Sequence, residues 1–323
     1  MKKDTLVISG ISSFVGANLA IEFSNKGFNV IGLISRSFEE YEYPRNLRLE
    51  ICRNRGVSFY QLDLKENYSI KKFFQDKHPD YFIHHAAWTN NANSPQFDLN
   101  EAIKVNVKPL RTLYEELKKC SAKGIIITGT NQEYGDKETG FKEDDICMPT
   151  TQYGLSKLCM TITASQLCNE FKVPTRIARL FNPIGALDNP NKLLPCIIHK
   201  VSKDNKFDLS KCIQQRDFIY IKDLAEGYIK LVDDFKRKDF DIFNICSGEA
   251  ITLKYLLFQI VKYMGKNKNL LQFGSVPMRI GEPLISFGNN KKAKELLGWN
   301  PSSIKDKVNI FVDEILNEND KQN

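Results

Sequence analysis

The sequence predicts an α/β protein built on a doubly wound parallel sheet, with a smaller C-terminal lobe interleaved with it. From residue 5 to about residue 180, short apolar runs typical of buried parallel strands alternate with helical segments. A glycine-containing turn joins the first of these strands to the first helix. After about residue 181 the alternation loosens into turn-rich segments. Alternation of this kind gives parallel strands joined by right-handed crossovers.

The elements of the larger part follow in regular order. Strands are expected at residues 5–9, 29–34, 57–62, 81–85, 124–128 and 175–180. Helices are expected after the first turn to about residue 26, from about 98 to 121, and from 152 to about 170. Ligands of such sheets bind beyond the carboxyl ends of the strands, so the segments that follow each strand are the first place to look for a site.

The second half is predicted to leave the sheet and return to it. Helices are expected at residues 195–203, from 223 onward, at 252–265 and at 290–297, and a strand at 240–246 that rejoins the sheet. No repeat or flexible linker separates the parts. We therefore expect a sheet domain of residues 1–180 plus about 217–247, and a smaller lobe of residues 181–216 and 248–323.

Composition excludes several classes of protein. The net charge of +7 is spread along the 323 residues, without the basic stripe interleaved with aromatic residues that a nucleic-acid-binding protein would show. No run approaches the ~18 apolar residues of a membrane span. The eight cysteines have no C-x-x-C spacing, and the adjacent His84 and His85 have no third ligand in view, so no metal site is expected. We expect a cytoplasmic protein without nucleic-acid or membrane partners.

The first turn has the composition of an anion site. The turn consists of the residues Gly10, Ile11, Ser12, Ser13, Phe14, Val15 and Gly16. Free N–H groups at the start of a helix, together with the helix dipole, bind a pyrophosphate, as in dinucleotide-binding folds of the Rossmann type. Ser13 stands where a glycine is usual, and its small side chain is tolerated there. The alternative is an ordinary glycine-punctuated turn.

The end of the second strand bears on which dinucleotide binds. NAD-dependent proteins of this fold usually place an acidic residue there, on the ribose 2′-hydroxyl. This chain has Ser35-Arg36-Ser37 instead. A missing acid and a present arginine favour the 2′-phosphate of NADP, with NAD as the alternative.

Tyr153 and Lys157 lie four residues apart in the predicted helix at 152–170, which places them on one face. A phenol titrates near ~10 in water and is a poor base at neutral pH. A neighbouring ammonium favours the phenolate and is expected to lower the pKa of Tyr153. The pair is therefore predicted to exchange a proton with a carbonyl or alcohol.

Small and polar residues follow other predicted strands. Ala86 and Ala87 follow the strand at 81–85 and let the backbone approach a ligand, and Thr130 and Asn182 stand at the ends of the fifth and sixth strands. Because parallel strands end at one edge of a sheet, we expect these residues to share a cleft with Gly10.

Together these residues resemble the extended short-chain dehydrogenase/reductase superfamily, in its group of nucleotide-sugar epimerases, dehydratases and reductases. The resemblance covers nearly the whole chain. Its motifs are Ser9 to Gly16, Ala86-Ala87, Asn106, Thr130 to Gly135, Tyr153 to Lys157, Asn182, Arg216 to Asp223, Arg279 to Glu282, and Leu297 to Pro301.

The resemblance implies a role for each matching residue. Tyr153 would be the general acid/base, Lys157 would bind the nicotinamide ribose, and Thr130 would hydrogen-bond the reacting oxygen. The cofactor would contact Gly10, Ser13, Phe14, Val15, Gly16, Arg36, Asp63, Leu64, Ala86, Ala87 and Asn106, with Asp63 and Leu64 beside the adenine. The diphosphate of a nucleotide sugar would be held by Asn182, Arg216 and Arg279, since arginine forks match phosphate oxygens. A surface ion pair is the alternative for each arginine.

One departure from the family pattern narrows the reaction. Related 4,6-dehydratases carry acids in the two positions after the threonine, whereas this chain has Asn131 and Gln132, which cannot transfer the proton; Glu133, one position later, leaves the question open. We therefore expect an NADPH-dependent reductase of a nucleoside-diphosphate 4-keto-6-deoxy sugar in deoxysugar biosynthesis. The alternatives are an epimerase that retains its NAD(P) and, least favoured, a non-catalytic dinucleotide sensor. A homodimer is expected by resemblance.

Overall fold

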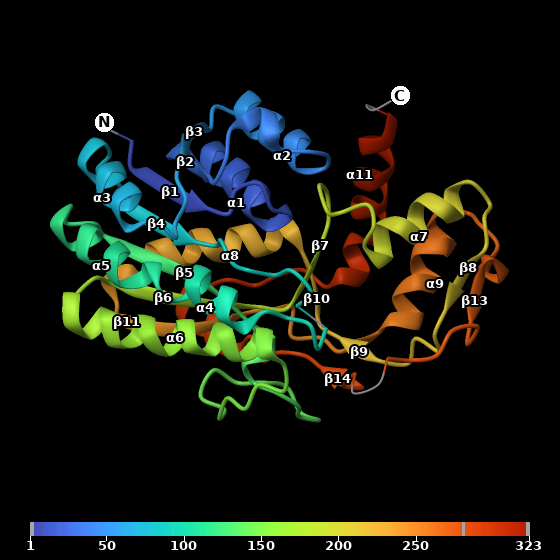
Figure 1. Cartoon of the computed structure of the whole chain (residues 1–323). Coiled ribbons are helices and arrows are strands. Elements are labelled where there is room, and N and C mark those ends of the chain that lie inside the picture. Colours follow the sequence, from blue (N-terminus) through green and yellow to red (C-terminus); the bar gives the residue numbers. More distant parts are fainter. Residues whose placement is uncertain (1–2, 93, 280–281, 321–323) are drawn as a thin grey trace.

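A seven-stranded parallel sheet forms the centre of the larger domain (Figure 1). The computed structural model describes residues 3–92, 94–279 and 282–320. The strands are β1 (Thr5–Ser9), β2 (Asn29–Ile34), β3 (Ser58–Gln61), β4 (Tyr81–His84), β5 (Gly124–Thr130), β6 (Thr175–Leu180) and β11 (Phe240–Ile245). They lie in the order β11-β6-β5-β4-β1-β2-β3, and every neighbouring pair is parallel. The predicted doubly wound sheet is confirmed, including the late strand that rejoins it.

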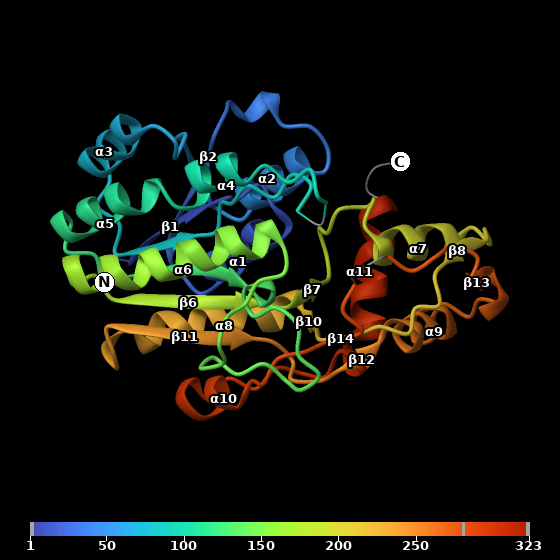
Figure 2. The same ribbon diagram turned by 60° about the horizontal axis from the view of Figure 1, so that its bottom comes forward.

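Helices cover both faces of this sheet (Figure 2). On one face lie α1 (Phe14–Asn25), α2 (Arg45–Asn54) and α8 (Ile221–Asp233), and on the other α3 (Asn67–Asp76), α4 (Leu99–Asn106), α5 (Pro109–Lys119) and α6 (Gln152–Phe171). Successive strand side chains point to opposite faces. Leu6 and Ile8 of β1 accordingly join the core under α1 and α8, whereas Val7 joins the core under α5 and α6.

The single long helix expected at residues 98–121 is wrong: the structure has two helices there, α4 and α5, separated at Val107 and Lys108. Pro109 is the first residue of α5, a position that needs no N–H donor and suits the fixed φ of proline. In a continuous helix the same proline would remove a hydrogen bond and collide with the preceding turn. Asn106 therefore ends α4, where its side chain reaches Ser156 of α6.

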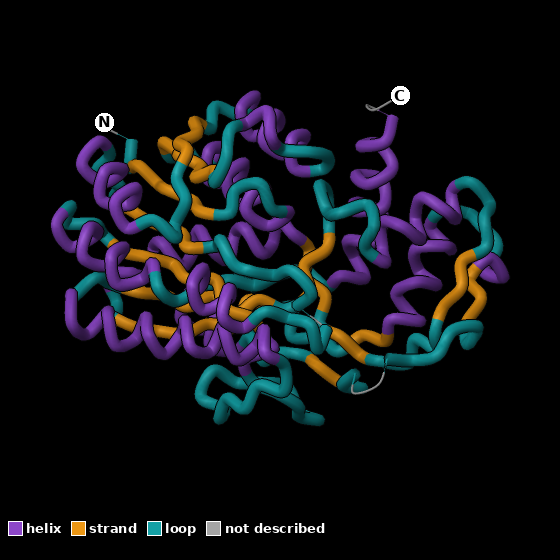
Figure 3. Tube along the Cα trace, viewed as in Figure 1, coloured by secondary structure: helices purple, strands orange, loops and turns teal. Residues whose placement is uncertain are grey.

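The smaller lobe lies beyond the carboxyl edge of the sheet (Figures 1 and 3). A parallel pair, β7 (Asn182–Ile184) and β10 (Phe218–Tyr220), leads into it. Its further elements are α7 (Leu193–Ser202), β8 (Phe207–Leu209), β9 (Gln215–Arg216), β12 (Ile251–Thr252), α9 (Leu253–Tyr263), β13 (Leu271–Phe273), β14 (Ile285–Ser286) and α11 (Val308–Asp320). The helix α10 (Lys291–Leu297) packs back against β11. The domain boundaries given above remain a prediction.

The eight cysteines are all free. Among the described residues, no helix combines the length and the apolar character needed to cross a bilayer.

Asp217 joins the two parts of the molecule. Its buried carboxylate accepts hydrogen bonds from the Ser247 N–H (2.8 Å), the Ser247 hydroxyl (2.7 Å) and the Gly248 N–H (2.9 Å), and a longer one from the Gly288 N–H (3.3 Å). Burial raises the pKa of Asp217 to about 6, although these donors oppose the rise. The residue therefore ties the start of β10 to the loop after β11 and to the segment after β14.

We expect Asp217→Ala to destabilise the protein by about 3 kcal/mol, because it leaves several buried donors without an acceptor. Urea unfolding followed by circular dichroism measures this loss. Asp217→Asn, which keeps one carbonyl acceptor, should lose less. A change of less than about 0.5 kcal/mol for the alanine variant, the range of ordinary surface substitutions, would contradict the role given to this carboxylate.

Candidate active site

The turn between β1 and α1 is packed backbone against backbone. Gly10 has φ +73°, and a Cβ added there would lie 2.8 Å from the Ala86 nitrogen. A Cβ on Gly16 would lie 2.3 Å from the Gly10 oxygen. Ser13 caps α1, and its hydroxyl accepts the Gly16 N–H at 3.0 Å, which explains why serine suits this position. The next two side chains are buried in the core: Phe14 and Val15. A ligand at this turn would therefore meet main-chain groups.

Ser9, which belongs to the sequence motif but was given no role of its own, fixes the neighbouring strand end. Its buried hydroxyl accepts the N–H groups of His85 and Ala86, each at 3.1 Å, and lies 3.3 Å from His84 Nδ1. The backbone of β4 is thus held against the end of β1, and Ala87 follows directly. A serine at the end of an otherwise apolar strand was the available clue.

Arg36 extends from the end of β2 over an aromatic ring. Its guanidinium carbon lies 4.7 Å from the centre of the Tyr41 ring, and the Tyr41 hydroxyl accepts the Ser35 N–H at 3.1 Å. Arg36 is exposed and makes no ion pair with the described residues. Beyond the adjacent strand β3, Asp63 accepts the N–H of Lys65 and Leu64 is buried. An unpaired, ring-supported guanidinium at this edge suits an anionic group.

Thr130, Tyr153 and Lys157 are brought together from two elements. Thr130 ends β5, and the other two lie one turn apart near the start of α6. The Tyr153 phenol and the Thr130 hydroxyl are hydrogen-bonded. Thr151 caps α6 by accepting the Gly154 N–H at 3.0 Å, and the ring of Phe97 packs edge-on against that of Tyr153. A hydroxyl pair and an ammonium therefore meet at the carboxyl edge of the sheet.

The expectation that Lys157 lowers the pKa of Tyr153 is wrong for this structure. Burial raises the pKa of Tyr153 to about 12, the negative charge of Glu133 adds to the rise, and the hydrogen bond from Thr130 opposes it. Burial disfavours the charged phenolate more than neighbouring groups favour it. At neutral pH the phenol is consequently protonated, the form that can donate a proton.

Lys157 carries a buried ammonium whose donors are hardly used. The residue is 1% exposed. Among the described residues, its Nζ donates a hydrogen bond to Met160 Sδ at 3.9 Å. Burial lowers the pKa of Lys157 to about 8, and the charge of Glu133 partly offsets this. An ammonium has three N–H donors, so hydroxyl groups of a ligand would accept hydrogen bonds from the other two.

Asn106 supports this region from α4. Its side-chain oxygen accepts the Trp88 N–H at 2.8 Å, and its amide donates to the Ser156 hydroxyl at 3.2 Å. The residue is fully buried. It therefore links the segment after β4 to α6 beside Lys157.

We expect binding of NADPH to weaken as the pH rises through about 8. The pKa of Lys157 is depressed, so its ammonium, which would donate to the cofactor, is present below about 8 and is lost above it. Affinity should fall by up to about tenfold per pH unit above this value. Fluorescence titration of NADPH between pH 6.5 and 9.5 measures it, where the pH limits are ~1.5 units on either side of that pKa. This fall in affinity at high pH should be missing in Lys157→Met. The same fall in that variant would contradict the role given to the Lys157 ammonium.

The three residues after Thr130 are committed to other contacts. Asn131 donates from its amide to the Ser286 hydroxyl at 3.1 Å, and Gln132 accepts the Thr151 hydroxyl at 2.9 Å. Glu133 is fully buried and pairs with Arg179 at 3.0 Å. No carboxylic acid among these three is free to act on a ligand.

Two of the three residues expected to hold a diphosphate are hydrogen-bonded to other residues of the protein. Arg216 donates to Glu282 at 2.8 Å, and the Asn182 amide donates to the Asp217 carbonyl at 2.8 Å. Arg279 is exposed, and residues 280–281 of its motif lie outside the described part of the chain. A phosphate bound at Arg216 would compete with Glu282 for its guanidinium.

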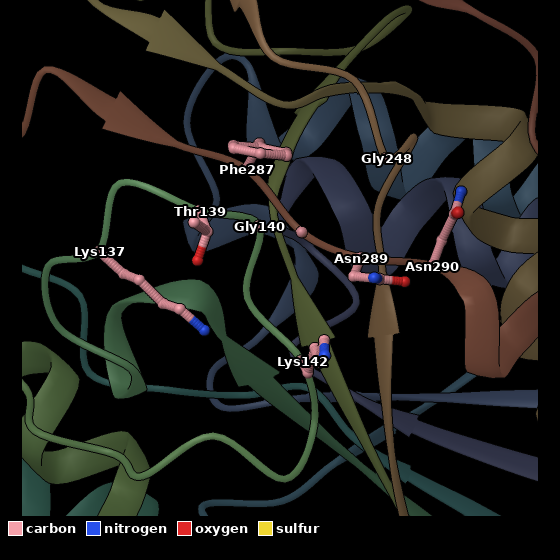
Figure 4. A pocket seen from close by; sticks show the side chains of 9 residues that line it. Lys137, Thr139, Gly140, Lys142, Gly248, Phe287, Asn289 and Asn290 are labelled. Atoms are coloured by element: carbon pink, nitrogen blue, oxygen red, sulfur yellow. The ribbon is translucent and has the colours of Figure 1, made fainter.

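A separate surface pocket of about 510 Å³ opens between the segments around residues 137–142 and 287–290 (Figure 4). Its lining includes Lys137, Lys142, Phe287 and Asn289, and none of the residues predicted for cofactor, substrate or catalysis. Lys137 is paired with Asp145 at 2.7 Å. The pocket is therefore distinct from the cluster around Tyr153.

Comparison with known proteins identifies the family to which this chain is similar. A model of the NAD dependent epimerase/dehydratase family matches residues 6–246. The chain belongs to this family. The resemblance drawn from the sequence motifs is thereby confirmed.

Family members that resemble this chain differ in their reactions. The dTDP-4-dehydro-6-deoxyglucose reductase of Escherichia coli is 27% identical over 321 residues, covering 94% of this chain and 95% of the relative. The UDP-glucose 4-epimerase of Bacillus subtilis is 24% identical over 317 residues, with 91% of each covered. A solved UDP-glucose 4-epimerase of Thermotoga maritima has the same fold, with a TM-score of 0.83, 21% identity, and coverage of 97% of this chain and 99% of that chain. Family membership alone therefore does not choose between reduction and epimerisation.

Proposed function

We propose that this protein is an NADPH-dependent reductase of a nucleoside-diphosphate 4-keto-6-deoxy sugar. The observation that carries the proposal is the meeting of Thr130, at the end of β5, with its hydrogen-bond partner Tyr153 and with Lys157 one helical turn further along α6. This is the arrangement needed to protonate an oxygen that gains negative charge. A place in deoxysugar biosynthesis and a cytoplasmic location are part of the same proposal.

The residues fit the dinucleotide that this reaction requires. Gly10 lets the turn at the helix start pack without a side chain, Lys157 uses few of its donors, and Arg36 follows β2, the strand end where this fold binds the ribose 2′ position. Arg36 supports NADP over NAD because its charge complements the phosphate and no acid stands at that strand end. When bound, the reduced dinucleotide supplies the hydride.

The chain's own residues would handle the proton and the oxygen. Thr130 orients the keto oxygen through its hydroxyl, and Tyr153 donates its proton to that oxygen as it becomes an alkoxide. Lys157 would hold the cofactor through its ammonium, and solvent would reprotonate the phenolate after each turnover. Arg216 and Arg279, with Asn182, would bind the diphosphate and so place the sugar.

Two observations favour reduction over the related reactions. A dehydratase needs an acid after Thr130, and the residues there are hydrogen-bonded amides followed by the Arg179-paired Glu133. An epimerase must first remove a proton from an alcohol, which a phenol with a pKa of about 12 does poorly. The Escherichia coli reductase among the relatives adds support.

Epimerisation with retained NAD(P) is the second candidate, because relatives named as UDP-glucose 4-epimerases match over nine-tenths of the chain. The two functions differ in cofactor use. A reductase consumes NADPH with each turnover, whereas an epimerase returns its cofactor unchanged and would be purified with it bound.

The function is tested by incubating the purified protein with NADPH and dTDP-4-dehydro-6-deoxyglucose, then with other nucleoside-diphosphate 4-keto sugars. Loss of nicotinamide absorbance in step with product supports the proposal. The matched controls contain the corresponding sugar without the keto group. No loss of absorbance with any keto sugar would contradict it.

We also propose that the protein is a homodimer that pairs through the outer face of α6. Leu155 and Ile162 lie two turns apart on this face and are 40% and 61% exposed. Apolar residues exposed at this spacing suit a helix that packs against a second copy. Light scattering coupled to size exclusion should give twice the chain mass, and the chain mass for Ile162→Glu.

A further inference from the structure

The Glu133 carboxylate is enclosed by three donors from three elements. Its Oε1 accepts the Thr130 N–H at 2.9 Å, and its Oε2 accepts the Thr161 hydroxyl at 2.9 Å and the Arg179 Nε at 3.0 Å. Glu133 is 0% exposed. These donors belong to the end of β5, to α6 and to β6, so a single carboxylate ties the three together.

The surrounding residues are shaped to admit this carboxylate. A Cβ added at Gly129 would lie 2.5 Å from Glu133 Oε1, so the residue before Thr130 leaves room for it. The Arg179 guanidinium also lies over the Tyr134 ring, 4.4 Å from its centre, which holds the cation in place. Burial of both charges is tolerated because each has a hydrogen-bonded partner.

The connection to α6 leads directly to the catalytic face. Thr161 follows Lys157 by four residues, as Lys157 follows Tyr153, so the three lie along one face of the helix. Glu133 therefore bonds to Thr130 on one side and, on the other, to the helix face that carries the phenol and the ammonium.

We propose that Glu133 is a positioning residue: its buried carboxylate, balanced by Arg179, holds Thr130 against the Tyr153–Lys157 face of α6 and sets a negative charge beside that face. The inference rests on the proposed reductase function, since protonated groups serve proton donation. Because Glu133 is 0% exposed, no proton transfer is assigned to it.

The charges around the pair support the second part of the inference. The Glu133 charge raises the pKa of Tyr153 and opposes the fall in the pKa of Lys157 that burial causes. Two imidazoles at the end of β4 and just after it, His84 and His85, also lie near this pair, and burial lowers the pKa of each to about 3, which leaves it neutral. Among the described residues, Arg179 of β6 adds a positive charge, hydrogen-bonded to the carboxylate at 3.0 Å.

A second buried ion pair on the same strand provides the matched control. Arg176 of β6 pairs with Asp234 at 2.6 Å, with side chains 0% and 4% exposed. This pair lies toward the opposite end of β6 and contacts none of the residues predicted for the site. It therefore separates loss of a buried ion pair in general from loss of the Glu133 contacts.

The experiment compares wild type with E133Q/R179Q, which removes both charges together and leaves no guanidinium stranded, and with T161V and R176Q/D234N. The first readout is the pH dependence of the NADPH dissociation constant, which reports Lys157 and needs no substrate. The second is the pH dependence of kcat/KM for reduction. E133Q/R179Q should move the high-pH limb of both profiles about one unit lower and reduce kcat about tenfold.

The other variants separate charge from geometry. T161V keeps the carboxylate charge and should reduce kcat several-fold, about the cost of one hydrogen bond, without moving either limb. R176Q/D234N should change neither limb. Unmoved limbs and a kcat within about twofold of wild type in E133Q/R179Q would overturn the inference. If wild type reduces no keto sugar, the reductase proposal fails, while the NADPH profile still decides the effect of Glu133 on Lys157.

Discussion

Replacing Tyr153 by phenylalanine should lower the rate of NADPH-dependent reduction by about 10²–10⁴-fold, the contribution typical of a general acid. The phenol is half-buried, hydrogen-bonded to Thr130 and protonated at neutral pH, so its hydroxyl is the proton source nearest the expected keto oxygen. Phenylalanine keeps the ring that packs against Phe97. Stopped-flow measurement of NADPH oxidation gives the rate, and the NADPH dissociation constant should stay within about twofold, because the hydroxyl acts mainly in the transition state.

Tyr114→Phe is the matched control for this variant. The Tyr114 hydroxyl lies in the core, 2.8 Å from the Thr175 hydroxyl, so the same atom and one hydrogen bond are removed away from the site. This variant should lose some stability, about 1 kcal/mol, and keep its turnover. Full activity in Tyr153→Phe, or an equal loss in Tyr114→Phe, would contradict the role of Tyr153 as proton donor.

Replacing Arg36 by alanine should reduce the preference for NADPH over NADH. An arginine–phosphate contact involves hydrogen bonds between charged groups, worth about 2–3 kcal/mol. Because ~1.4 kcal/mol is a factor of ten, kcat/KM for NADPH should fall about 30- to 100-fold while that for NADH stays within about twofold. The Tyr41 hydroxyl, which holds the Ser35 N–H, is left in place by the change. Initial rates with the two cofactors measure the switch.

The control for Arg36 is Arg53→Ala. Arg53 likewise lies over an aromatic ring, with its guanidinium carbon 3.8 Å from the centre of the Phe38 ring, and its loss changes the net charge equally. It lies in the last turn of α2 rather than at the end of β2. Equal effects of the two substitutions, or a wild-type enzyme indifferent to the cofactor, would contradict NADP binding at Arg36.

Local patterns in the sequence were enough to predict the parallel sheet and the pairing of Tyr153 with Lys157. The strand–helix alternation specifies parallel neighbours, and Tyr153 and Lys157 meet simply because four residues make about one helical turn. Gly16 is predictable for the same reason, because its close contact is with Gly10 in the same turn, whereas Gly10 packs against the distant Ala86. The break between α4 and α5 is also predictable from the sequence, because Pro109 cannot stand inside a continuous helix.

The rest of the site depends on contacts between distant parts of the chain. Glu133 and Arg179 are 46 residues apart, and no local pattern pairs them before the register of β5 and β6 is known. The pKa of Tyr153 could not be inferred for the same reason. The sequence shows the lysine one turn away, whereas the burial and the Glu133 charge that outweigh it arise from tertiary packing.

The measurement that tests the central claim most directly is transfer of deuterium from NADPH labelled at C4 of the nicotinamide. A keto-sugar substrate is converted with each of the two labelled stereoisomers of the cofactor, and the product is analysed by mass spectrometry and NMR. We predict one deuterium at C4 of the sugar from one of the two stereoisomers, with one NADP formed for each product molecule. An altered sugar without deuterium and without net oxidation of NADPH would contradict the assignment as a reductase.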